Sequence, residues 1–136
     1  MAETKEQGFS AEEKKAIKQR AAELKKRENG DAEVRKVITA MTKDEQDMAL
    51  RIHEGILERF PQLQPKLRYG QPAYYLDGKV VCFFMAASKY STRYSTFGFE
   101  DAADFGESMW PSAFGLTSLS DADLRKLLEL VERAVG

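Results

Sequence analysis

Four acidic side chains near the C-terminal third of the chain are spaced so that they could hold a metal ion together. Glu100, Asp104 and Glu107 lie at positions i, i+4 and i+7, and Asp101 is adjacent. If residues 100–107 form a short helix, these carboxylates share one face, and hard oxygen ligands of this kind suit weakly bound ferrous iron. The stronger interpretation is that acidic groups early in a helix interact well with its dipole and keep the surface soluble.

The chain has one histidine and one cysteine. His53 falls on the apolar face of an expected helix, so we expect it to pack at the edge of the core and bond to backbone, rather than act as a base or a lone metal ligand. Cys82 lies in an apolar run, where a buried thiol has a raised pKa. A Cys–His pair would require the fold to bring the two together, and the two alone cannot complete a zinc site.

No recognisable catalytic motif is present, and we predict a protein without enzymatic activity. The segment Gly106–Trp110 resembles a nucleophile elbow but lacks its second glycine. The sequence contains neither a phosphate-binding loop nor a Gly-x-Gly-x-x-Gly motif.

A bend rich in aromatic residues is a candidate site for a small organic ligand. Tyr69, Gly70, Pro72 and Tyr74 shape this bend. Arg93, Tyr94 and Trp110 add side chains of the kind that line ligand clefts, although such residues also close a protein core without any ligand.

The basic and aromatic region 66–94 also raises the alternative of single-stranded nucleic acid, whose bases can stack on aromatic rings. A net charge of −1 disfavours this interpretation, because it leaves only a thin electrostatic footprint.

Changes in hydrophobic period place these residues on helices and strands. Capping boxes at Ser10–Glu13 and Thr42–Glu45 predict two helix starts. The first helix is expected to end at Asn29-Gly30, and Asp31 to cap a second one. Asp77-Gly78 predicts a hairpin before an apolar strand. Residues 91–99 are expected to form the next strand, with Arg93 and Tyr94 on opposite faces, and residues 112–117 a last strand. Ser120 is expected to cap a final helix.

The expected fold is therefore α+β, a curved antiparallel sheet of about five strands packed against N- and C-terminal helices. Residues 1–30 are expected to form a helical extension, mostly exposed, and residues 31–136 one compact domain. A length of 136 residues suits a single domain.

Several stretches together resemble a known group of proteins. These are Tyr69-Gly70-Gln71-Pro72-Ala73-Tyr74, the Asp77–Phe84 turn and strand, and the Phe9–Glu13, Arg93–Phe99 and Trp110–Phe114 segments. The chain resembles the YdhG-like families of small bacterial-type domains of unknown function, in particular their longer actinobacterial-type members. Because some YdhG-like proteins are described as frataxin-like iron chaperones, the resemblance implies a non-catalytic binding module that handles iron. Many relatives carry Lys-His where this chain has Lys89-Tyr90, which weighs against a metal role there.

Composition sets the remaining expectations. The first residues are polar and no apolar run approaches the length of a membrane span, so we expect a cytoplasmic protein without a signal peptide or a membrane partner. We expect a monomer or weak homodimer that binds a small ligand or a metal ion, with no certain cofactor.

Overall fold

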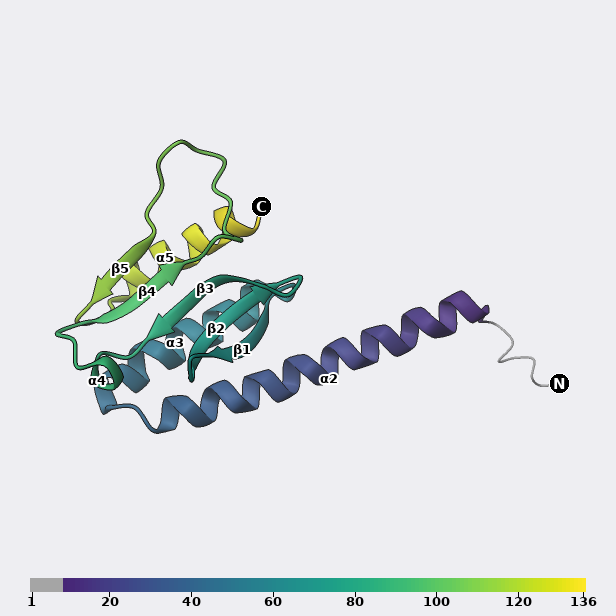
Figure 1. Cartoon of the computed structure of the whole chain (residues 1–136), viewed down its shortest axis with the longest axis horizontal. Coiled ribbons are helices and arrows are strands. Elements are labelled where there is room, and N and C mark those ends of the chain that lie inside the picture. The colour runs from purple at the N-terminus through teal and green to yellow at the C-terminus, as the bar shows by residue number, and fades with distance from the viewer. Residues whose placement is uncertain (1–8) are drawn as a thin grey trace.

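The computed structural model describes residues 9–136 as an α+β fold, with helices before and after one antiparallel sheet, as the sequence predicts (Figure 1). The helices are α2 (Ala11–Thr39), α3 (Lys43–Arg59), α4 (Ala87–Tyr90) and α5 (Asp121–Val135). The strands are β1 (Gln64–Arg68), β2 (Gln71–Leu76), β3 (Lys79–Met85), β4 (Ser95–Phe99) and β5 (Ala113–Leu116). Within the described residues, no helix is both long and apolar enough to cross a membrane.

The five strands form a meander in which each strand pairs with the next along the chain, in the order β1-β2-β3-β4-β5. Tyr69-Gly70 joins β1 to β2, and Asp77-Gly78 joins β2 to β3. All four residues have positive φ angles, of 54°, 74°, 51° and 82°, as tight two-residue hairpin turns require. The hairpin predicted at Asp77-Gly78 is therefore confirmed.

Helices α3 and α5 lie on the same face of the sheet, and the core fills the space between them and the strands (Figure 1). The apolar faces of the two helices are buried. Their innermost residues include Ile52, Ile56 and Val131, which belong to one cluster with Phe84 and Phe97 of the sheet.

Both predicted capping boxes are present at the helix starts. Ser10 Oγ accepts from Glu13 N at 3.0 Å, and Glu13 returns the bond to Ser10 N. Thr42 and Glu45 do the same for α3, and Ser120 caps α5 as expected, in a third box completed by Asp123. Such boxes satisfy backbone N–H groups that the first helical turn leaves free.

Helix α2 corrects the helix end predicted at Asn29-Gly30. It continues through Asn29-Gly30 to Thr39, so the expected helix end there is wrong, and Asp31 is not a helix cap. The reason is a long-range contact: a Cβ on Gly30 would lie 2.0 Å from the Pro65 carbonyl oxygen of β1. Glycine is needed here because the two backbones approach closely, within a continuous helix.

The N-terminal half of α2 extends beyond the body of the domain (Figure 1). Ile17 and Leu24 are 52% and 57% exposed, which agrees with the mostly solvated helix predicted for this segment. Contact with the body begins at Arg27, whose guanidinium donates to the carbonyl oxygens of Leu57, Phe60 and Leu63. Arg27 thereby satisfies carbonyl groups at and beyond the C-terminal end of α3.

Residues 87–94 do not form the strand that was predicted to begin at Ser91. Ala87–Tyr90 is the single turn α4, Ser91 has a φ of 54°, and β4 begins only at Ser95. Glu45 of α3 explains the turn, because its carboxylate accepts from both the backbone N–H and the hydroxyl of Ser88. Arg93 and Tyr94 therefore do not occupy opposite faces of a strand.

The short helix predicted at residues 100–107 is also absent. Ala103 N–H bonds to Glu100 O in a turn, but Asp104 N–H donates to Ala134 O of α5 instead of continuing the turn. Gly106 then takes a φ of 64°, and its N–H bonds to Asp104 Oδ1. Contact with α5 and the glycine together override the local helical preference.

Candidate functional site

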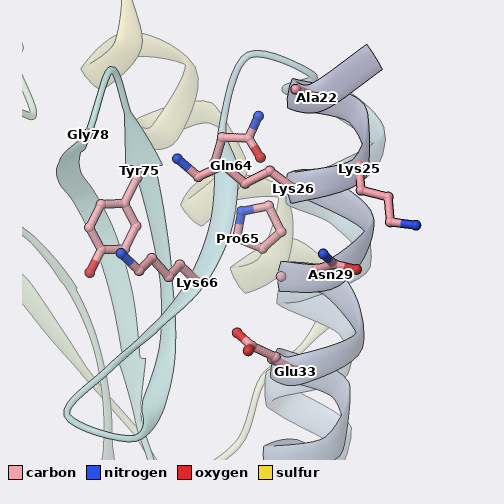
Figure 2. A pocket seen from close by; sticks show the side chains of 11 residues that line it. Ala22, Lys25, Lys26, Asn29, Glu33, Gln64, Pro65, Lys66, Tyr75 and Gly78 are labelled. Atoms are coloured by element: carbon pink, nitrogen blue, oxygen red, sulfur yellow. The ribbon is translucent and has the colours of Figure 1, made fainter. Parts of the chain in front are cut away.

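A cleft lies where α2 passes β1 and the β2–β3 turn (Figure 2). Its volume is about 430 Å³, within the range of small-ligand sites. One wall is α2, which contributes Ala22, Lys25, Lys26, Asn29, Gly30 and Glu33. The other wall is the sheet, which contributes Gln64, Pro65, Lys66, Tyr75 and Gly78.

The cleft carries more positive than negative charge, with three lysines against Glu33. Lys26 extends from α2 toward β1, whereas Lys25 points away from the cleft (Figure 2). On the opposite wall, Lys66 Nζ lies 5.5 Å from the centroid of the Tyr75 ring, a cation–π distance. Two cations therefore flank a cavity that also presents an aromatic ring.

Gln64 of the same wall has a buried side-chain oxygen. Its Oε1 atom is buried and has no hydrogen-bond partner among the described residues. A buried acceptor without a partner is costly, and in most proteins a side chain, a water or a ligand satisfies it.

The close approach of Gly30 to Pro65 fixes the spacing of the two walls of the cleft, because both residues line it. Because Gly30 has no side chain, α2 can approach β1 at this level. N-terminal to it, the helix leaves the body of the domain (Figure 1). The cleft thus follows from one contact between two backbones that lie far apart in the sequence.

The lining of the cleft combines charged, aromatic and amide groups. The lining residues include three lysines, one tyrosine and one glutamate. Lysine ammonium groups, an aromatic ring and amide groups can recognise the charge and shape of a ligand.

A second polar cluster joins α2, α3 and β2 inside the domain. His53 is fully buried, with Nε2 2.7 Å from Asp31 Oδ1 and Nδ1 2.8 Å from the Tyr74 hydroxyl. Asp31 also accepts from Arg35 at 2.7 Å. His53 is buried as expected, but it bonds to two side chains and not to backbone.

The partners of His53 determine its tautomer. An ionised carboxylate can only accept, so Nε2–H donates to Asp31, and Nδ1 accepts from the Tyr74 hydroxyl. Burial lowers the pKa of His53 and the Asp31 hydrogen bond only partly opposes this, so the imidazole is neutral. Burial alone would raise the pKa of Asp31, but hydrogen bonds from His53 and Arg35 lower it overall.

Tyr74 and Cys82 have no access to a substrate. Both are completely buried, and burial raises the pKa of each. Cys82 sits opposite Tyr74 in the β2–β3 ladder. The raised pKa predicted for Cys82 agrees with this position. The cluster of His53, Asp31 and Tyr74 links three elements of the fold, α2, α3 and β2.

Replacing Tyr74 by phenylalanine is expected to lower the free energy of unfolding by about 1.5 kcal/mol, because His53 Nδ1 would stay buried without its donor. Urea unfolding at pH 7.5, followed by circular dichroism, measures the change. Tyr75→Phe is the matched control, since Tyr75 is the next residue of β2 but only half-buried. Its loss should stay within about 0.5 kcal/mol. Equal losses in the two variants would contradict the role assigned to the Tyr74 hydroxyl.

The seven residues predicted to bind a ligand occupy separate places, and none lines the cleft. Tyr69 and Gly70 form an exposed turn, whereas Pro72 and Tyr74 are buried. The other three residues, Arg93, Tyr94 and Trp110, precede strands β4 and β5, which lie at the opposite end of the strand order from β1.

Arg93 stacks over the Tyr94 ring at 5.5 Å, and Tyr94 packs against Gly115. Trp110 is 46% exposed and stacks on Phe105 with ring centroids 6.3 Å apart. These contacts give each of the three a packing role in the β4–β5 region.

The four acidic residues considered for iron do not share a helical face, because residues 100–107 form no helix. Glu100 pairs with Arg68 at 3.0 Å and Glu107 with Arg133 at 2.7 Å. Asp104 accepts from Gly106 N–H, and Asp101 is exposed in the turn. Across residues 9–136, no group of three or more histidine, cysteine, aspartate or glutamate side chains is arranged to hold a metal ion.

Comparisons with protein-family models, with curated proteins and with solved structures found no match to this chain. The geometry of the described residues is therefore the basis for any functional statement.

Sequence reasoning placed Lys66 and Tyr75 in the basic and aromatic region but missed the cleft. The missed partners are Lys26, Asn29 and Glu33 of α2 and Gln64 of β1. The available signal was Gly30: a glycine between two strongly helical segments indicates either a helix end or a close contact. The second possibility would have placed α2 beside another element.

Proposed function

We propose that the protein binds a small organic anion in the cleft between α2 and β1. The observation that carries the proposal is the placement of Lys26 and Lys66 on facing walls of a cavity that also contains the Tyr75 ring. The volume suits a ligand with a flat apolar body and one carboxylate or phosphate group.

The test uses defined probes that share one ring and differ in charge. We expect 4-hydroxybenzoate and phenyl phosphate to stabilise the protein in thermal-shift measurements, with the neutral 4-hydroxybenzamide giving a smaller shift. Amide chemical shifts of Lys26, Asn29 and Lys66 should move on titration, because these residues line the cleft. No shift with either anion, or equal shifts with the neutral probe, would reject the proposal.

Charge variants locate the site. Lys66→Gln is expected to weaken binding of 4-hydroxybenzoate about fivefold, since one solvent-accessible ion pair contributes up to about 1 kcal/mol. Lys79→Gln is the matched control, because Lys79 is also exposed but lies outside this cleft. If both variants lose affinity equally, the anion responds to overall charge and not to the cleft.

Iron handling, the function implied by the family resemblance, stays a prediction without a defined site. Two of its four candidate carboxylates are engaged in ion pairs with Arg68 and Arg133. The cleft offers cations and a single carboxylate, which suits an anion better than ferrous iron. A calorimetric titration with ferrous ion under anaerobic conditions, compared with the 4-hydroxybenzoate titration, distinguishes the two functions.

A further inference from the structure

All five lysines of the projecting part of α2 lie on one side of the helix. At 100° per residue they fall within an arc of about 120°. We call this set the lysine stripe: Lys14, Lys15, Lys18, Lys25 and Lys26. Every one of these side chains belongs to an exposed residue.

The carboxylates of the same segment lie outside the arc of the lysine stripe. They are Glu12, Glu13, Glu23 and Glu28, and the same 100° rotation places them on the remaining surface of the helix. Like charges side by side destabilise a helix slightly, by about 0.2–0.5 kcal/mol per pair. Arg20 and Arg27 lie on the carboxylate side by the same rotation, so the lysines alone form a separate face of one sign, with repulsion that alternating charges would remove.

The lysine stripe lies on the part of α2 that leaves the body of the domain (Figure 1), and two of its five residues, Lys25 and Lys26, also line the cleft. It spans about 18 Å from Lys14 to Lys26 at 1.5 Å per residue. One strand of duplex DNA places about five phosphates along that distance, at 3.4 Å each. The number and the spread of the cations both match a segment of phosphate backbone.

We propose that the lysine stripe binds the phosphate backbone of nucleic acid, without reading its sequence. This goes beyond the proposed function, because most of the stripe lies outside the cleft and its partner is a polymer. The rest of the molecule carries the compensating negative charge, since the whole chain has a net charge of −1. That imbalance orients a polyanion toward α2 and away from the body.

The distribution of apolar residues on α2 favours nucleic acid over an anionic membrane. A helix that lies in a membrane surface needs a broad apolar face beside its lysines. Ile17 and Leu24 are the large apolar residues of this segment, and they share their side of the helix with Glu13 and Glu28. Carboxylates at that position would oppose burial in an anionic lipid surface.

The experiment measures fluorescence anisotropy of a labelled 20-base-pair DNA duplex, and of one of its single strands, with the full chain. We expect the duplex to bind at 50 mM KCl. The logarithm of the association constant should fall with the logarithm of the salt concentration at a slope of about −4.5, because each of about five neutralised phosphates contributes about 0.9. The triple variant K14Q/K15Q/K18Q should bind at least tenfold more weakly and reduce that slope by about 3. A smaller slope of about −3.5 with the single strand is expected from its lower charge density.

The control variant K43Q/K79Q/K126Q makes the same charge change at three exposed lysines outside α2. It should keep the wild-type salt slope. Circular dichroism checks that α2 is still helical in both triple variants. No binding at 50 mM KCl, or equal losses in the two triple variants, would overturn the proposal.

Two further outcomes would also overturn it. Binding to phosphatidylserine vesicles without binding to DNA would assign the stripe to a membrane. Self-association that depends on the stripe, without DNA binding, would assign it to a second copy of the chain. The cleft is tested separately, because K14Q/K15Q/K18Q should leave the 4-hydroxybenzoate response unchanged, and Lys66→Gln should leave the DNA slope nearly unchanged.

Discussion

Replacing Gly30 by alanine is expected to lower the free energy of unfolding by about 2 kcal/mol, although alanine is the better helix former. A Cβ at this position would lie 2.0 Å from the Pro65 carbonyl oxygen and 3.0 Å from its carbon. Backbone atoms of a paired strand cannot move aside as a flexible side chain can, so the cost is near the upper end of overpacking, about 3 kcal/mol. The gain in helix propensity, about 1 kcal/mol, offsets only part of it.

The matched control for this prediction is Asn29→Ala, one position away on the same helix. Asn29 is exposed in the cleft, so alanine there should leave the stability unchanged or raise it by a few tenths of a kcal/mol. Urea unfolding measures both variants. A stabilised Gly30→Ala protein would show that α2 does not approach β1 this closely.

The same substitution also tests the origin of the cleft. If the Gly30–Pro65 contact fixes the spacing of its walls, forcing α2 away from β1 changes the distance between Lys26 and Lys66. The response to 4-hydroxybenzoate should then weaken in Gly30→Ala but not in the K79Q control. Stability and ligand binding would thus change together through one backbone contact.

The parts of this fold that depend on neighbouring residues could be predicted from the sequence. Each capping box closes within four residues, and the Asp77-Gly78 turn requires only its own backbone angles. Gly30 shows why the α2 prediction failed. Its local signal is that of a helix end, but its cause is Pro65, which is 35 positions later in the chain.

The candidate site was harder to predict because its walls come from distant segments. Lys26 and Lys66 have no sequence relation that places them opposite each other, and Gln64 is notable only because its oxygen is buried without a partner. For His53, the periodicity correctly predicted burial. Its two bonding partners, Asp31 and Tyr74, could not be predicted, because the local pattern at Asp31 indicates a helix cap that the fold does not form.

A short segment of α2 therefore supports both the fold and the cleft. Arg27 bonds to carbonyl groups around the end of α3, Gly30 contacts β1, and Asp31 reaches His53 of α3. The free half of the helix is an extension of this anchored segment. Its direction, and with it the direction of the lysine stripe, is set by these three contacts.

The free energy of unfolding is expected to fall as the pH is lowered from 7.5 to 5, because His53 is buried in its neutral form. Burial lowers its folded-state pKa below the ordinary 6.5. Below about 6.5 the unfolded chain therefore binds a proton that the folded chain does not. The contribution of neutral His53 to the unfolding free energy is fully present above that pH. It is lost as the pH falls from there to the folded-state pKa, by up to about 1.4 kcal/mol per pH unit.

The cluster explains why the folded protein resists the proton. A second N–H on the imidazole would point at the Tyr74 oxygen, and the Tyr74 hydroxyl would lose its acceptor while buried. The charged groups that act on the ring are Asp31 and Arg35 of α2 and Glu54 of α3. Asp31 has its own lowered pKa, so the stability that it contributes is lost only in a separate window, as the pH falls below 3.8.

The variant His53→Gln separates this effect from general acid sensitivity. Glutamine does not titrate, so the unfolding free energy of the variant should be nearly constant between pH 7.5 and 5. At pH 7.5 it should be lower than that of the wild type by about 3 kcal/mol, because the Tyr74 hydroxyl is left without its acceptor. Since His53 is the only histidine, no other side chain of ordinary pKa titrates near 6.5. Urea unfolding of both proteins at half-unit pH steps measures the two slopes. Parallel slopes would mean that the proton binds elsewhere, whereas a slope in the wild type alone assigns it to the imidazole between α2 and β2.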